Sequence, residues 1–141
     1  MGAILAVDYG TKRIGLAISD PGKVFAFPCA AIENKGFAYI LSQINGLILE
    51  KEVELILVGM PYNMNKKMSD EKKNEMEINI ENFINKLQKS ISVPIKVVDE
   101  RLSSFAAEEK LKEAGISAKK SRKYVDSEAA RLLLEEFLPN T

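Results

Sequence analysis

The chain begins with the stretch AILAVDYGTKRIGLAIS, residues 3–19, and this stretch decides the fold. Residues 3–9 and 14–19 are two apolar runs rich in β-forming residues, and only residues 10–13 separate them. A gap this short leaves no room for a crossover helix, so the two runs are predicted to pair as antiparallel strands. After a turn at residues 20–22, residues 24–32 are predicted to add a third antiparallel strand.

Beyond these strands the spacing of the apolar residues changes to that of a helix. The predicted elements are a helix over about 37–51, a buried strand over 55–58, a helix carrying Met76 to Leu87, a strand over 95–98, a helix from Ser103 or Ser104 to Gly115, a basic loop and a final helix over about 126–138. Right-handed crossovers then place both later strands, parallel, beside the first strand. The predicted fold is one α/β domain over residues 1–141: a five-stranded mixed sheet, three antiparallel strands and then two parallel ones, with helices on both faces.

The composition excludes several kinds of chemistry. The 141 residues include 20 basic and 20 acidic residues, no histidine and one cysteine. Histidine bases, histidine zinc sites and internal disulfides are therefore excluded, and catalysis would fall to carboxylates, Lys, Tyr, Ser, Thr, Arg or a carboxylate-bound metal. The lone Cys29 suits a reducing cytosol, and we find no signal peptide or membrane-spanning apolar run, so a cytoplasmic protein is expected.

Acidic residues lie at the ends of two predicted strands and at the start of a predicted helix, all at one edge of the sheet. Asp8 closes the first strand, Asp99 and Glu100 follow the last strand, and Asp126 opens the final helix. Converging carboxylates without histidine suit Mg²⁺ or Mn²⁺ and the two-metal hydrolysis of phosphodiesters. Each acid also has an ordinary structural explanation: a turn residue, a surface ion pair with Arg101, or a helix N-cap.

Basic residues surround these acids, so the zero net charge does not argue against a nucleic-acid substrate. Gly10 allows a phosphate to approach the backbone, and Thr11 to Arg13 supply donors, although a plain glycine turn is the alternative. Tyr9, Tyr62 and Tyr124 are available to stack on bases or to pack in the core. The candidate nucleic-acid contacts are Lys12, Arg13, Asn63, Lys66, Arg101, Lys120, Arg122 and Lys123.

Four blocks of the sequence resemble the YqgF/RuvX family, in the family's order. They are VDYGTKRIGLA (7–17), VGMPYNMN (58–65), DERLSS (99–104) and VDSEAA (125–130), and together they span nearly the whole chain. The family is described as pre-16S ribosomal RNA nucleases related to Holliday-junction resolvases. One departure is Asn65-Lys66-Lys67, which stands where the family often carries a glycine and small polar residues.

The resemblance implies a ribonuclease H-like fold and a Mg²⁺ site on Asp8, Glu100 and Asp126. It favours Glu100 over Asp99. Strand alternation sends these two neighbours to opposite faces of the sheet, and the sequence alone leaves open which of them shares a face with Asp8.

The leading hypothesis is a Mg²⁺-dependent endonuclease that processes the 5′ end of precursor 16S rRNA, as a monomer with a homodimer possible. A second hypothesis is cleavage of Holliday junctions, which needs a symmetric dimer. A third is a non-catalytic factor that binds precursor rRNA or the pre-ribosome. Nucleotide binding is a further alternative, because residues 8–11 also resemble the phosphate loop of actin-like and Hsp70-like ATPases, which contain two such folds.

Overall fold

A computed structural model describes residues 2–60, 75–99 and 118–138, except for the side chains of 118–126. The strands are β1 (Ala3–Asp8), β2 (Arg13–Ser19), β3 (Ala26–Glu33), β4 (Val53–Met60) and β5 (Ile95–Asp99). The helices are α1 (Phe37–Lys51), α2 (Glu75–Ser90) and α4 (Ala118–Phe137). No helix within the described ranges has the length and apolar character needed to cross a membrane.

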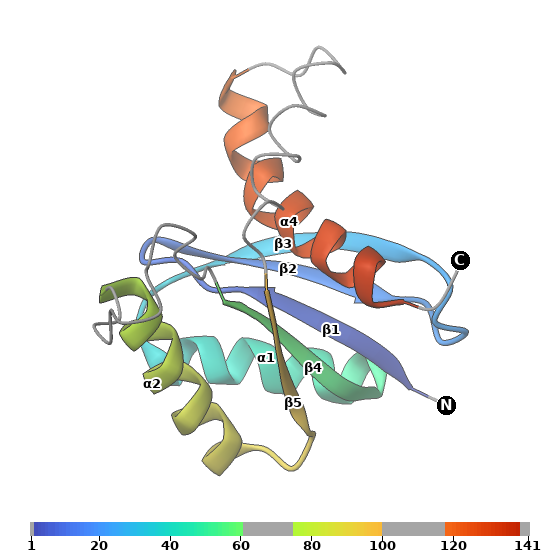
Figure 1. Ribbon diagram of the computed structural model, residues 1–141, viewed down its shortest axis with the longest axis horizontal. Coiled ribbons are helices and arrows are strands. Elements are labelled where there is room, and N and C mark those ends of the chain that lie inside the picture. The colour runs from blue at the N-terminus through green and yellow to red at the C-terminus, as the bar shows by residue number, and fades with distance from the viewer. Residues whose placement is uncertain (1, 61–74, 100–117, 139–141) are drawn as a thin grey trace, which may run out of the picture.

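The five strands form one mixed sheet in the order β3-β2-β1-β4-β5, as predicted (Figure 1). Strands β1, β2 and β3 pair antiparallel, whereas β4 is parallel to both β1 and β5. The connections explain this difference, because β1, β2 and β3 are joined by short turns and α1 carries the chain back from β3 to β4. The predicted helix ending at Gly115 lies outside the described residues, as do residues 61–74.

The central strand β1 is buried on both faces of the sheet. Its odd-numbered residues, such as Leu5 and Val7, pack in one apolar cluster with α1 and α2. Its even-numbered residues, Ile4 and Ala6, pack in a second cluster with α4. The helices therefore cover both faces, α1 and α2 on one and α4 on the other (Figure 1). Burial of each large apolar side chain contributes about 1.5–3 kcal/mol, so both clusters hold β1 at the centre.

The final helix differs from the prediction, because it begins at Ala118 and not near residue 126. The basic segment 119–123, expected to be a loop, belongs to this helix, and Asp126 is not its N-cap. The helix extends because lysine and arginine are good helix formers and no glycine or proline interrupts residues 118–138. The apolar periodicity used for the prediction begins only at Ala129, and the apolar side chains from Ala129 on are buried or half-buried.

A β-bulge and a buried hydroxyl fix α4 against β3. Two residues of β3, Ala30 and Ala31, face only Gly15 on β2, because the pairing jumps from Leu16↔Cys29 to Ile14↔Ile32. Next to this bulge, the buried Ser127 of α4 donates a hydrogen bond from Oγ to the carbonyl oxygen of Cys29, at 2.5 Å. The helix is thus held at one position along the sheet.

The loop between β1 and β2 is a tight turn that Asn34, the residue after β3, holds by hydrogen bonds to its backbone. A Cβ atom on Gly10 would lie 2.4 Å from the carbonyl oxygen of Arg13, so only glycine fits. Asn34 Nδ2 donates to the Gly10 carbonyl oxygen at 2.9 Å, and the Asn34 backbone N–H donates to the Lys12 carbonyl oxygen at 2.9 Å. Gly10 is therefore required by the tight turn itself, whatever the loop binds.

The Gly10→Ala substitution is expected to lower the free energy of unfolding by about 1–3 kcal/mol, because the new methyl group forces the loop backbone to move. Gly46→Ala is the matched control, since a Cβ at this exposed position in α1 meets no atom within 4 Å. That control should raise stability by roughly 0.5–1 kcal/mol. Urea unfolding measures both variants, and equal effects of the two would contradict the tight turn.

The Ser127→Ala substitution is expected to lower the free energy of unfolding by about 1–3 kcal/mol, because the Cys29 carbonyl loses its side-chain donor. Ser90→Ala is the control: Ser90 Oγ also donates to a carbonyl oxygen, that of Lys86, but at an exposed position. Its effect should stay within about 0.5 kcal/mol. If the two variants unfold at the same urea concentration, the buried hydrogen bond does not anchor α4.

Candidate active site

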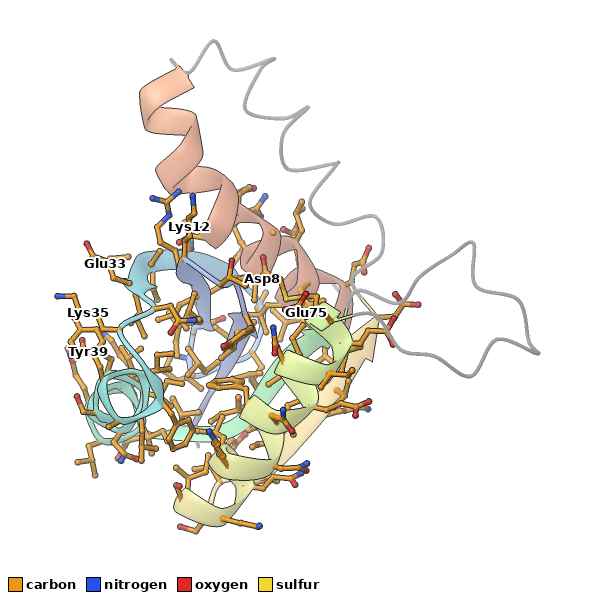
Figure 2. All side chains as sticks on the ribbon, turned by 90° about the vertical axis from the view of Figure 1, so that its left-hand side faces the viewer. Asp8, Lys12, Glu33, Lys35, Tyr39 and Glu75 are labelled. Atoms are coloured by element: carbon orange, nitrogen blue, oxygen red, sulfur yellow. The ribbon has the colours of Figure 1, made fainter. Side chains whose placement is uncertain are left out.

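The carboxyl ends of β1, β4 and β5 form one edge of the sheet, and Asp8 lies at this edge. Figure 2 looks onto the edge, with Asp8 near the centre of the view and Lys12 above it, toward α4. Ligands of open α/β sheets bind outside the carboxyl ends of parallel strands. The half-buried Asp8 therefore occupies the position at which such sheets carry their functional groups.

Glycines flank Asp8 on both neighbouring strands. Asp8 pairs with Gly15 on β2, and the β1–β4 pairing that ends at Val7↔Val58 leads next to Gly59. Neither strand therefore places a side chain directly beside Asp8. A carboxylate at the end of a buried strand needs water, hydrogen bonds or a cation to compensate for lost solvation, and this arrangement gives such partners access.

The three predicted acids differ in how much the structure shows of them. Carboxylate oxygens are the ligands that Mg²⁺ prefers, so Asp8 is chemically suited to this ion. Within residues 2–60, 75–99 and 118–138, no group of three or more Asp, Glu, Cys or His side chains is arranged to hold a metal ion. Glu100 and the side chain of Asp126 lie outside the described part of the chain.

Asp99 lies at the same edge as Asp8 but on the opposite face of the sheet. It pairs with Met60, which packs in the cluster beneath α1 and α2. Asp8 follows Ala6 by two residues and so lies on the face that α4 covers. With β4 between their strands, the backbones of the two acids are also roughly 10 Å apart. The structure therefore does not bring Asp99 together with Asp8.

The backbone of Asp126 lies in α4, immediately before the anchored Ser127. Cys29, Leu16 and Val7 are paired in one row across β3, β2 and β1. Ser127 binds the first of them through its hydrogen bond to the Cys29 carbonyl oxygen. This row ends next to Asp8. The anchor thus brings the part of α4 that contains Asp126 to the level of Asp8 along the strands.

Two of the predicted basic residues lie in the described loop and strand. Lys12 and Arg13 are both exposed. Arg13 is two residues before Gly15 on β2, so it lies on the same face of the sheet as Asp8. The other candidates lie outside the described residues or have side chains outside them: Asn63, Lys66, Arg101, Lys120, Arg122 and Lys123.

Tyr9 points to the face opposite Asp8 and packs among aromatic residues. Its ring centroid lies 4.8 Å from that of Phe83 on α2, and its hydroxyl accepts a hydrogen bond from Asn34 Nδ2 at 3.3 Å. Sequence reasoning missed the role of Asn34; its place after a strand and just before Gly36 was the available signal, because asparagine favours such turns. Tyr62 and the side chain of Tyr124 lie outside the described residues.

Burial disfavours the reactive thiolate form of the single cysteine. Burial raises the pKa of the Cys29 thiol, and the positive charge of Lys51 offsets this only in part. A thiol with a raised pKa stays protonated and reacts slowly. Among the described residues at this edge, Asp8 and Asp99 supply carboxylates, and Lys12 and Arg13 supply cationic side chains.

Comparison with known proteins identifies the family. The RuvX family model, described as Holliday junction resolvase, matches residues 2–140. A protein of Maridesulfovibrio salexigens named "Putative pre-16S rRNA nuclease" is 40% identical over 135 residues, which cover 96% of each chain. A protein of Halothermothrix orenii with the same name is 42% identical over 135 residues, which cover 96% of this chain and 93% of that protein.

A solved structure confirms the fold. The structure of T. thermophilus RuvC in complex with a Holliday junction substrate matches with a TM-score of 0.58 over 94% of this chain and 91% of that chain, at 13% identity. At this identity the likeness concerns the fold alone. The chain therefore belongs to the RuvX family of nucleases, and its mixed sheet has the ribonuclease H-like fold that the resemblance implied.

Proposed function

We propose that the protein is a divalent-metal-dependent endonuclease, with the carboxylates of Asp8, Glu100 and Asp126 as metal ligands. The observation that carries this proposal is the place of Asp8, at the carboxyl end of the buried central strand with glycine on both neighbouring strands. Membership of a nuclease family supports hydrolysis of phosphodiester bonds as the reaction.

The position of Asp99 supports Glu100 as the second ligand. Asp99 belongs to the face covered by α1 and α2, where Asp8 does not lie. Side chains alternate along an extended chain, so the residue after Asp99 is the better candidate to share a face with Asp8.

The Ser127 anchor supports Asp126 as the third ligand. It holds the preceding residue of α4 at the row of paired residues next to Asp8. A ligand beside a fixed residue keeps its position more precisely than one on a free loop.

A bound Mg²⁺ or Mn²⁺ would activate water and stabilise the leaving oxygen of the phosphodiester. The three carboxylates would hold and orient the ion. The exposed Arg13, on the face of Asp8, would bind a phosphate oxygen of the substrate, and Lys12 would contribute a second cation beside it. The further proposed contacts with the nucleic acid are Asn63, Lys66, Arg101, Lys120, Arg122 and Lys123.

We propose precursor 16S rRNA as the substrate, cut at its 5′ end by a monomer in the cytoplasm during ribosome biogenesis. The names of the two relatives support this substrate. The description of the family model supports a second candidate, the Holliday junction. That reaction needs two active sites facing opposite strands and hence a symmetric dimer.

The Asp8→Asn and Glu100→Gln variants are expected to cut a defined precursor 16S RNA roughly 100-fold more slowly than wild type in Mg²⁺, the scale on which a lost electrostatic group lowers kcat. Both substitutions remove a charge with little change in size, so RNA binding in EDTA should persist. Asp99→Asn is the matched control and should cut at close to the wild-type rate. Cleavage by Asp8→Asn at the wild-type rate would contradict the site, and equal losses in Asp99→Asn and Glu100→Gln would contradict the choice of Glu100.

A second measurement separates the substrates. The wild-type protein in Mg²⁺ is expected to cut the 5′ region of precursor 16S RNA, leave a four-way DNA junction intact and remain a monomer by light scattering. Its RNA affinity should fall with rising salt in proportion to the phosphates contacted. Paired, symmetric cuts in the junction by a dimer would establish the second candidate. RNA binding with no cleavage of either substrate would establish a non-catalytic binding factor.

A further inference from the structure

A pocket of about 230 Å³ opens on the face of the sheet opposite Asp8. It lies between the start of the β1–β2 loop, the beginning of α1 and α2. Tyr9 and Phe37 contribute aromatic rings, and Asn79, Asn82 and Lys86 contribute polar groups from α2. None of the metal-site chemistry proposed above uses this pocket.

We propose that this pocket binds one unpaired base of the nucleic-acid strand that is cut at Asp8. The inference rests on the proposed function and deepens it, because it makes a strand with at least one unpaired base the substrate. The pocket is smaller than the roughly 300–1,000 Å³ of sites that enclose whole small molecules, so it suits a single ring-sized group.

The aromatic wall of the pocket is fixed before any ligand arrives. Phe83 is buried, and its ring lies 4.8 Å from that of Tyr9 and 6.2 Å from that of Phe37, centroid to centroid. The hydrogen bond from Asn34 further holds the Tyr9 hydroxyl. Aromatic side chains stack on bases of any sequence, and rings that are already fixed lose little freedom when they do so.

The polar wall carries the groups that recognise the edge of a base. Asn79 and Asn82 each offer an amide donor and an amide acceptor, and neither side chain makes a hydrogen bond within the described part of the chain. Lys86 Nζ lies 5.8 Å from the centre of the Phe37 ring, with no ion-pair partner among the described residues. Paired donors and acceptors suit a base, and a nearby ammonium group suits its phosphate.

The pocket and Asp8 both lie at the carboxyl end of β1, on opposite faces of the sheet. Tyr9 directly follows Asp8, and successive side chains point to opposite faces. A single strand that crosses the end of β1 can therefore place a phosphate at Asp8 and a nearby base against Tyr9. A continuous duplex cannot do so without releasing that base from its pair.

The test measures binding of a single-stranded fragment of precursor 16S RNA in EDTA, so that cleavage plays no part. A set of fragments carries one abasic nucleotide at each position in turn. For the wild-type protein, one abasic position should lower the affinity roughly tenfold. The double variant Asn79→Ala/Asn82→Ala should bind the intact RNA about as weakly and lose its sensitivity to that abasic position, because the two changes remove the same interaction.

Matched variants on the same helix serve as controls. Asn85→Ala and Lys89→Ala alter exposed residues of α2 that do not line the pocket, and they should leave both the affinity and the abasic effect unchanged. Lys86→Ala should weaken the binding of every fragment. It should also make the affinity depend less steeply on salt, by the amount expected for the loss of about one phosphate contact. Thermal unfolding of each variant verifies that it folds.

Three outcomes would overturn the pocket proposal. They are an abasic effect that survives in the double variant, equal losses in the Asn85→Ala control, and no abasic effect at any position. Cleavage that depends on Asp8 would leave the nuclease proposal standing in each case. Conversely, the wild-type protein could cut no RNA and still show an abasic effect that the double variant lacks. That result would contradict the nuclease proposal and support the base pocket.

Discussion

The burial of β1 on both faces is the constraint on which the rest of the structure depends. Leu5 and Val7 belong to the cluster with α1 and α2, and Ala6 belongs to the cluster with α4. This alternation sets the direction of the next two side chains, Asp8 and Tyr9. A shift of one residue in the pairing of β1 would exchange their faces, so the apolar core, rather than any polar contact, determines where the acid lies.

The two faces of the sheet differ in the size of their side chains near this edge. On the α4 face no large side chain stands directly beside Asp8: glycines, Gly15 and Gly59, lie on the two neighbouring strands, and Ala6 precedes it on β1. A helix can approach such a surface closely, and the bulge in β3 with its Ser127 hydrogen bond completes the fit. On the other face the rings of Tyr9, Phe37 and Phe83 line a pocket. The difference is consistent with the proposed ion site on one face and the proposed base pocket on the other.

The sequence predicted the strand order and the α1 helix well, because short turns and apolar periodicity are local signals that tertiary contacts here reinforce. It misplaced the start of α4, since the apolar periodicity begins only at Ala129 and only helix propensity marks the residues before it. The sequence also could not assign Asp99 to a face of the sheet. Alternation shows only that neighbouring side chains point to opposite faces, whereas the pairing of Asp99 with Met60 shows which face Asp99 is on. Asn34 and Ser127 were missed because each acts on a carbonyl group distant in sequence.

The position of α4 over the first strand has a consequence for the synthesis of the chain. Ile4 and Ala6 precede the apolar residues that cover them, from Ala130 to Leu138, by most of the sequence. The sheet cannot protect this face until α4 has left the ribosome, because α4 is its cover. Contacts so distant in sequence slow folding, and exposed apolar strands favour aggregation. We therefore expect the nascent chain to depend on chaperones until α4 docks.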